Sequence, residues 1–189
     1  YMAQQVAEAF EQELMAHLRE AIGPAENAAR NGATGVALQA ALAPVPSEFE
    51  SVELVPLSRL SDHFVLVVES QLMVYGSDPV RHPGSSFAGL MLRDPNGQVI
   101  GAGGWWFRPS QFVIDHLQTV MEDRLPSKER LYGGIESIRN VSVMLVGPDG
   151  VEVRRVRSPG RSGAPASEPL TGPFEGFRVR VASAAQAPA

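Results

Sequence analysis

The spacing of the apolar residues changes once along this chain, and that change limits what the chain can fold into. Between residues 3 and 30 apolar side chains recur every three or four positions, which is the period of an amphipathic helix. After Ser47 this period is lost, and residues 52–55 and the continuously apolar residues 64–68 indicate strands instead. The sequence therefore predicts a long leading helix followed by a sheet.

The leading helix is predicted over residues 3–30, with one apolar stripe along it. The stripe consists of Val6, Ala7, Phe10, Leu14, His17, Leu18, Ala21, Ala25 and Ala28. Gly23-Pro24 predicts a kink or a break, because proline lacks an amide donor and crowds the preceding turn. Asn31-Gly32 is a suitable helix end, and a shorter helix is predicted over residues 35–42.

Two hairpins follow, and they share their turn chemistry. Residues 90–92 and 99–107 flank Asp94-Pro95-Asn96-Gly97, which suits a type I turn between antiparallel strands. Residues 143–146 and 151–156 flank a similar Pro-Asp-Gly turn. The remaining predicted elements are a strand at 72–75, a helix at 110–125, a mobile surface loop at 158–173 and a strand at 177–181.

Because hairpins dominate and no strand–helix–strand crossover recurs, the predicted fold class is α+β. We expect a mainly antiparallel sheet with helices packed on one face. The long N-terminal helix is expected to lie outside the sheet and to pack on it through its apolar stripe.

Composition excludes several classes of protein. The 189 residues include no cysteine, so disulfide scaffolds, thiolate zinc sites, iron–sulfur clusters and cysteine nucleophiles are excluded. A net charge of −5 argues against a nucleic-acid partner. There is no run of 18 apolar residues and no signal peptide at the start. Because the chain opens inside helical sequence, we expect it to be part of a longer protein.

The motifs of common enzymes are missing, and we expect neither a cofactor nor a metal. There is no Gly-x-Ser-x-Gly, no phosphate-binding loop and no His-Glu-x-x-His, and the four histidines lack metal-ligand spacing. One catalytic alternative stays open, a hydrolase that uses Asp78, His82 and Ser85 or Ser86. Because Pro79 and Pro83 interrupt this segment, it also fits a solvated loop.

The candidate ligand-binding residues centre on Trp105 and Trp106, which follow the glycine-rich segment 101–104. Successive strand residues face opposite sides, so one indole should enter the core and the other should meet a helix, a partner or a pocket. The alternative is that both are packing residues. Arg108 and Tyr132 are plausible polar companions, and His116 on the predicted helix completes the set.

The only basic cluster is formed by Arg154, Arg155 and Arg157, with Arg178 and Arg180 on the last strand. It fits either a solvated sheet face or a site for anions or membrane headgroups.

The order of several segments resembles a known family. These segments are Gly89 to Gly101, then Trp105 and Phe107, an amphipathic helix, the second Pro-Asp-Gly hairpin, and residues 174–179. That family is the extracytoplasmic, PAS-like sensor region of bacterial membrane-bound sensor histidine kinases. The resemblance implies a PAS-like sheet, a membrane span before the long helix, and a kinase module beyond the chain. It implies no common ligand residue.

From the resemblance we expect residues 1–32 to form a juxtamembrane helix, 34–183 the sensor domain and 184–189 a flexible tail. The expected function is periplasmic signal sensing by a membrane-anchored kinase, without catalysis in this segment. An unknown small molecule or periplasmic protein would be the partner, and the helix stripe would pair with its copy in a homodimer. A non-catalytic adaptor module stays a further alternative.

Overall fold

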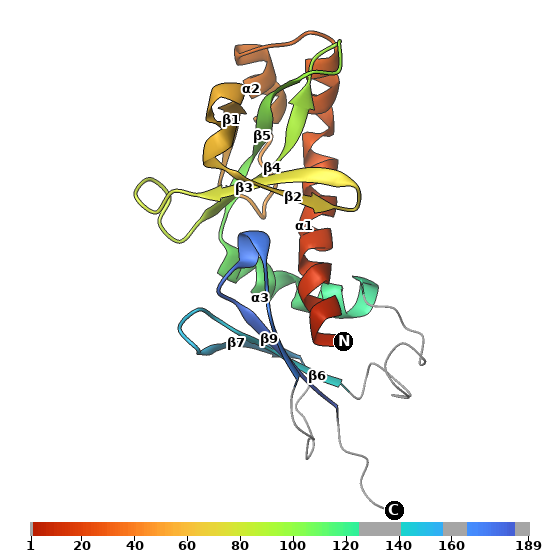
Figure 1. Cartoon of the computed structure of the whole chain (residues 1–189), viewed down its shortest axis with the longest axis vertical. Coiled ribbons are helices and arrows are strands. Elements are labelled where there is room, and N and C mark those ends of the chain that lie inside the picture. Colours follow the sequence, from red (N-terminus) through yellow and green to blue (C-terminus); the bar gives the residue numbers. More distant parts are fainter. Residues whose placement is uncertain (1, 125–140, 157–165, 184–189) are drawn as a thin grey trace, which may run out of the picture. The chain divides into compact units, whose positions relative to one another are not determined.

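The computed structural model describes residues 2–124, 141–156 and 166–183 (Figure 1). They form a mixed α+β structure with a long N-terminal helix and two antiparallel sheets, so the predicted fold class is confirmed. The chain divides into two compact units. Leu14–Phe112 is the five-stranded unit, and Tyr1–Glu13 together with Val113–Ala189 is the four-stranded unit. These units do not test the predicted domain boundaries at residues 32, 34 and 183, which stay predictions.

Helix α1 spans Met2–Arg30, as predicted, and its apolar stripe is buried at Val6, Phe10, Leu14 and Leu18. The predicted break at Pro24 does not occur, since α1 continues through it. Pro24 itself is exposed, whereas Ile22 and Ala25 on either side are fully buried and hold the helix in place. The stripe is thus buried within the chain at these four residues, and the predicted pairing of α1 in a homodimer stays a prediction.

The end of α1 is a Schellman motif. The amide of Ala33 donates to the carbonyl of Ala28 at 2.9 Å, and the amide of Gly32 donates to Ala29 at 3.0 Å. Gly32 has a φ of 90°, which explains why glycine stands there. Helix α2 follows at Val36–Leu42, close to its predicted range.

The five-stranded sheet has the order β1-β5-β4-β3-β2, and every neighbouring pair is antiparallel. Its strands are β1 Ser51–Pro56, β2 Phe64–Val68, β3 Gln71–Ser77, β4 Ser86–Arg93 and β5 Val99–Phe107. A 3₁₀ helix, η1, covers Leu57–Asp62. The β4–β5 turn is closed as predicted, by the amide of Gly97 donating to the carbonyl of Asp94 at 2.9 Å.

The two faces of this sheet bury different aromatic groups. On the Trp105 face, the indole of Trp105 stacks on Phe49 with ring centroids 5.3 Å apart, and Leu42 of α2 packs nearby at Gly103. On the Trp106 face, a second cluster joins Trp106 to the apolar residues Val55, Val74, Phe87 and Ala102, with Leu60 of η1 packed against it. Both indoles are therefore buried, one on each face.

Glycines let β4 and β5 approach closely at the centre of the sheet. Gly89 and Gly104 are register partners. A Cβ atom on Gly104 would lie 2.2 Å from the carbonyl oxygen of Ala88, and a Cβ on Gly89 would lie 2.3 Å from that of Gly103. At Gly89 and Gly104 the backbone of the neighbouring strand therefore occupies the space that a side chain would need.

Besides the first part of α1, the four-stranded unit contains most of helix α3, Pro109–Thr119, whose first residues belong to the other unit. A π-helical turn follows at Val120–Arg124. Its sheet has the order β7-β6-β9-β8. The strands are β6 Val141–Val146, β7 Glu152–Val156, β8 Ala166–Pro169 and β9 Arg178–Ser183. The second predicted hairpin is confirmed, and the strands form two sheets where the sequence predicts one.

The predicted loop at 158–173 is wrong over its second half, while residues 157–165 lie outside the described residues. Residues 166–169 form β8, because they pair with β9 in antiparallel register. Residues 172–174 form a 3₁₀ turn that buries Phe174 against Phe10 of α1, with ring centroids 5.9 Å apart. A local proline- and glycine-rich pattern does not reveal pairing with a distant strand.

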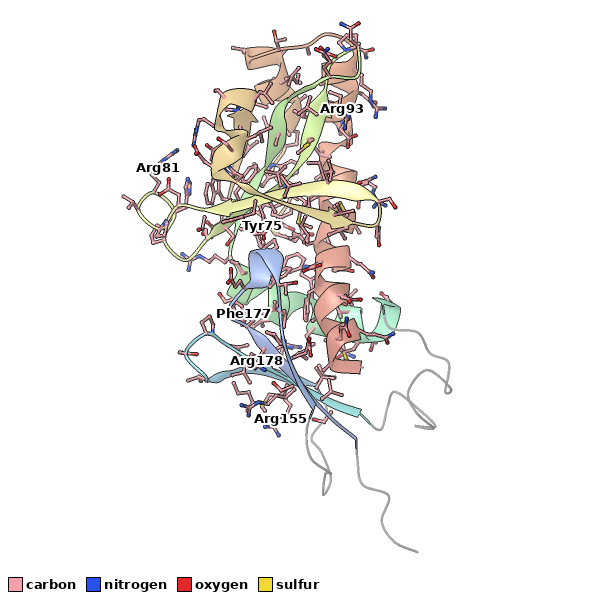
Figure 2. The ribbon with its side chains drawn as sticks, in the orientation of Figure 1. Tyr75, Arg81, Arg93, Arg155, Phe177 and Arg178 are labelled. Carbon is pink, nitrogen blue, oxygen red and sulfur yellow. The ribbon has the colours of Figure 1, made fainter. Side chains whose placement is uncertain are left out.

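Arginines stand on the exposed side of the four-stranded sheet. Arg155 and Arg178 are labelled in Figure 2. Arg155 and Arg180 both lie opposite Met144 in the strand register, and both are exposed. Arg155 is neutralised by Glu152, with Nε 2.7 Å from Oε1, and Arg178 donates to the hydroxyl of Ser167 at 3.1 Å. These contacts are typical of a solvated sheet face; Arg157 lies outside the described residues.

Glu11 of α1 makes the stability of the four-stranded unit depend on pH. Burial raises the pKa of the Glu11 carboxyl above its ordinary value. The hydroxyl of Thr171 donates to this carboxyl at 2.6 Å and lowers the pKa in part. The negative charge of Glu8 raises the pKa further. A raised folded-state pKa means that ionised Glu11 opposes folding. That cost is present above the folded pKa and disappears as the pH falls below the unfolded pKa.

We therefore predict that Glu11→Gln stabilises the chain at neutral pH by up to about 1 kcal/mol, since glutamine keeps the acceptor for Thr171 without the charge. Urea unfolding at a series of pH values checks this. The gain over the wild type should shrink as the pH falls through the range in which Glu11 takes up its proton. A gain that is the same at every pH would contradict the assignment.

Candidate functional site

Trp106 is the centre of the candidate site. Its Nε1 donates to Oε2 of Glu53 at 2.6 Å, so the polar edge of the indole is satisfied although the ring is buried. The imidazole of His82 lies flat on the indole, with ring centroids 4.0 Å apart and planes 9° apart. Phe87 contacts the same indole at a tilt, 5.8 Å away. The indole is thus held by a carboxylate at one edge and covered by a histidine.

Glu53 is placed by strand register. It lies opposite Gly104 on β5, and residues two apart on a strand share a face, so Glu53 lies on the same face as Trp106. Its side chain is only 16% exposed, and Nη1 of Arg59 on η1 lies 3.6 Å from Oε1. Charge from Arg59 and the hydrogen bond from Trp106 together compensate the half-buried carboxylate.

Glu50 carries a second ion pair just before β1. Its Oε1 accepts from Nε of Arg108 at 2.9 Å, and its Oε2 accepts from the hydroxyl of Ser85, also at 2.9 Å. The Glu50 amide donates to the carbonyl of Trp106 at 2.8 Å. The Trp106 cluster, as we call it, therefore consists of Glu50, Glu53, Arg59, His82, Ser85, Trp106 and Arg108. It holds two carboxylates and two guanidinium groups.

His82 and Ser85 come from the loop that joins β3 to β4. The loop is folded by its own backbone, because the amide of His82 donates to the carbonyl of Asp78 at 2.8 Å. The Asp78 carboxylate accepts the amide of Arg81 at 3.1 Å; Arg81 marks this loop in Figure 2. The hydrogen bonds within this loop thus position the His82 ring on the indole of Trp106.

The hydrolase alternative finds no support in this geometry. Asp78 bonds the Arg81 amide, Ser85 donates to Glu50, and the His82 ring stacks on Trp106. A serine nucleophile needs its hydroxyl within hydrogen-bonding reach of the histidine, and that of Ser85 is directed to a carboxylate instead. Ser86 lies within β4, opposite Phe107.

The predicted site residues are only partly brought together. Trp106 and Arg108 both belong to the cluster, whereas Trp105 lies on the opposite face of the sheet. His116 lies in the four-stranded unit, where its Nδ1 is 3.6 Å from Oε1 of Glu13. Tyr132 lies outside the described residues. Whether any of these residues binds a ligand stays a prediction.

Sequence reasoning missed Glu50 and Glu53. A signal for Glu53 existed, because it alternates with Val55 and so shares a face with an apolar strand residue. For Glu50 we find no such signal, since its role depends on Arg108, which is distant in the sequence.

Two cavities lie elsewhere in the five-stranded unit. One of about 310 Å³ is polar and is lined by residues of α1, β3 and β4, among them Glu26, Arg30 and Arg93. Another of about 400 Å³ is lined by α1 and the 44–48 segment, where Nδ1 of His17 lies 2.9 Å from Oε1 of Glu48. Neither is lined by a predicted site residue.

Comparison with known proteins leaves the family open. No protein family and no curated protein matches the sequence. Among solved structures, the chain is similar to an extracellular ligand binding receptor from Desulfohalobium retbaense DSM5692, with a TM-score of 0.40 and 13% identity. The similarity covers 97% of this chain and 40% of that receptor. Among the described residues, no helix is long and apolar enough to cross a membrane.

Proposed function

We propose that this chain is the ligand-sensing, extracytoplasmic part of a bacterial membrane-bound sensor histidine kinase. The sequence resemblance supports this, as does an antiparallel sheet preceded by a long helix. The kinase and the membrane anchors belong to the parent protein, outside these residues. The segment itself receives a signal and performs no reaction.

The observation that carries the proposal is the histidine stacked on Trp106. A buried indole with a satisfied nitrogen, covered by a side chain from a loop, is a recognition surface that a planar or cationic group can occupy when the loop moves. The carboxylates and guanidinium groups around it can exchange their mutual ion pairs for contacts with a ligand. We therefore propose a small polar ligand that carries charges of both signs.

The signal of ligand binding would pass from the five-stranded sheet to α1 where the two are in contact. Within the five-stranded unit, Arg19 of α1 holds the β2–β3 turn through Glu69 at 2.8 Å and Gln71 at 3.2 Å. A ligand that rearranges the Trp106 face can bias this contact only through different affinities for two arrangements. A coupling of about 1–3 kcal/mol changes output severalfold.

The test uses tryptophan emission together with thermal shift, against a panel of free amino acids, small amines and small carboxylates. In Trp105→Phe only Trp106 remains, because the chain has two tryptophans. A ligand should change its emission and raise the melting temperature; at 100 times its Kd the gain is about 2.7 kcal/mol.

The matched control is Val80→Ala on the same loop, which should leave the Kd unchanged, whereas His82→Ala should change it by about tenfold or more. A ligand that shifts the melting temperature of His82→Ala and of the wild type at the same Kd, with no change in Trp106 emission, would contradict the proposed site.

A further inference from the structure

Strand β2 has an unpaired apolar edge. Among the described residues it is the last strand of the five-stranded sheet and pairs on one side only, with β3 (Figure 1). Its five residues, Phe64–Val68, are all apolar. Phe64, Val65 and Val67 are 66%, 48% and 65% exposed. Exposed apolar side chains along a free edge are a template for pairing with another strand.

The apolar residues stand on both faces of β2. Phe64 lies on the face that stacks with Tyr75 of β3, ring centroids 5.6 Å apart, and Figure 2 labels this Tyr75. Val65 and Val67 lie on the other face, because side chains alternate. A ligand or a flat surface on one face would leave the other face exposed. A partner strand covers both.

The backbone of β2 offers hydrogen bonds in a defined pattern. The hairpin turn consists of Glu69 and Ser70, both with positive φ, so Val68 and Gln71 form the hydrogen-bonded pair that closes it. The bonds to β3 then alternate, and the amide and carbonyl groups of Val65 and Val67 point away from β3. These are the groups that a partner strand would bond.

The edge carries none of the usual protections. Natural edge strands are blocked by charges, proline or bulges. The opposite edge of the same sheet, β1, has Glu53 within it, ends at Pro56 and is followed by η1. β2 has no charge and no proline, and its register with β3 is uninterrupted.

We propose that β2 pairs with β2 of a second copy of this chain, antiparallel and around a two-fold axis at Leu66. In this register Val65 meets the partner's Val67 through their outward backbone groups, and apolar side chains meet on both faces. Asp62 then comes opposite Ser70 and His63 opposite Glu69, so no like charges face each other. The two sheets join into one of ten strands, a closed two-fold assembly.

The proposal is independent of ligand binding, and the experiment on it is a variant series in sedimentation equilibrium. The dimer fraction of the wild type should rise with protein concentration. Val67→Lys should raise the dissociation constant of the dimer by about 100-fold or more, because it places a charge in an apolar strand pairing. The control is Val80→Lys, at a valine of the β3–β4 loop that is 91% exposed and outside β2; it should leave the dimer intact. A monomeric wild type, or equal weakening by both variants, overturns the proposal.

A cross-link tests the register. The chain has no cysteine, so Leu66→Cys supplies a single thiol. At the two-fold axis Leu66 faces its copy as a non-hydrogen-bonded pair, with Cα atoms about 4.5 Å apart, within disulfide range. Mild oxidation should give a covalent dimer with Leu66→Cys and none with Val80→Cys. A dimer that Leu66→Cys fails to cross-link, or a chain that pairs only with a different protein, contradicts self-pairing through β2.

Discussion

Gly104→Ala is expected to destabilise the chain by about 3–5 kcal/mol or to prevent folding. The added Cβ would lie 2.2 Å from the carbonyl oxygen of Ala88 and 2.5 Å from Cα of Gly89. Both are backbone atoms of β4, so relief requires the central β4–β5 pairing to separate. Urea unfolding followed by circular dichroism measures the loss.

The matched control is the neighbouring glycine. In Gly103→Ala the same added atom meets Cδ1 of Leu42 at 3.0 Å and Cδ1 of Leu92 at 3.2 Å, which are the ends of flexible side chains. Because they can turn aside, we expect a loss of about 1–2 kcal/mol. Equal losses at both positions would mean that β4 and β5 are not held together as closely as described.

Trp105→Ala should cost about 3–5 kcal/mol, because it empties a fully buried site between the sheet and Phe49. Trp105→Phe should cost less than about 1 kcal/mol. Among the described residues, no acceptor bonds the buried Nε1 of Trp105. Phenylalanine leaves a small cavity but removes that unsatisfied donor, and the two effects oppose each other.

The comparison between these two variants is the informative measurement, again by urea unfolding. A phenylalanine variant that loses as much stability as the alanine variant would contradict the unsatisfied donor. It would show that the full indole shape, and not its ring area alone, is needed at this site.

Periodicity was enough to predict most elements of this fold. The stripe on α1, the apolar run of β2 and the alternation in β9 depend on which residues are apolar, and each pattern is contained in one segment. Turn chemistry was equally local: the Asp94-Pro95-Asn96-Gly97 turn and the Gly32 helix end were both predicted and both found.

The errors share one cause. Pro24 was expected to kink or break α1, and α1 continues through it between the buried residues Ile22 and Ala25. Residues 166–169 were expected to form a loop, and pairing with β9 made them a strand. In both cases contacts with residues distant in the sequence outweighed a local preference.

The candidate site also has a part that the sequence predicts and a part that depends on tertiary contacts. The alternation of Trp105 and Trp106 across a strand, and their nearness to Arg108, follow from the sequence alone. The stacking of His82 on Trp106 and the bond from Trp106 to Glu53 follow from loop closure and from the pairing of β1 with β5. Sequence spacing thus determined which side chains share a strand and a face. Only the tertiary structure decided which of them meet, because strand order and register are set by the packing of the whole sheet.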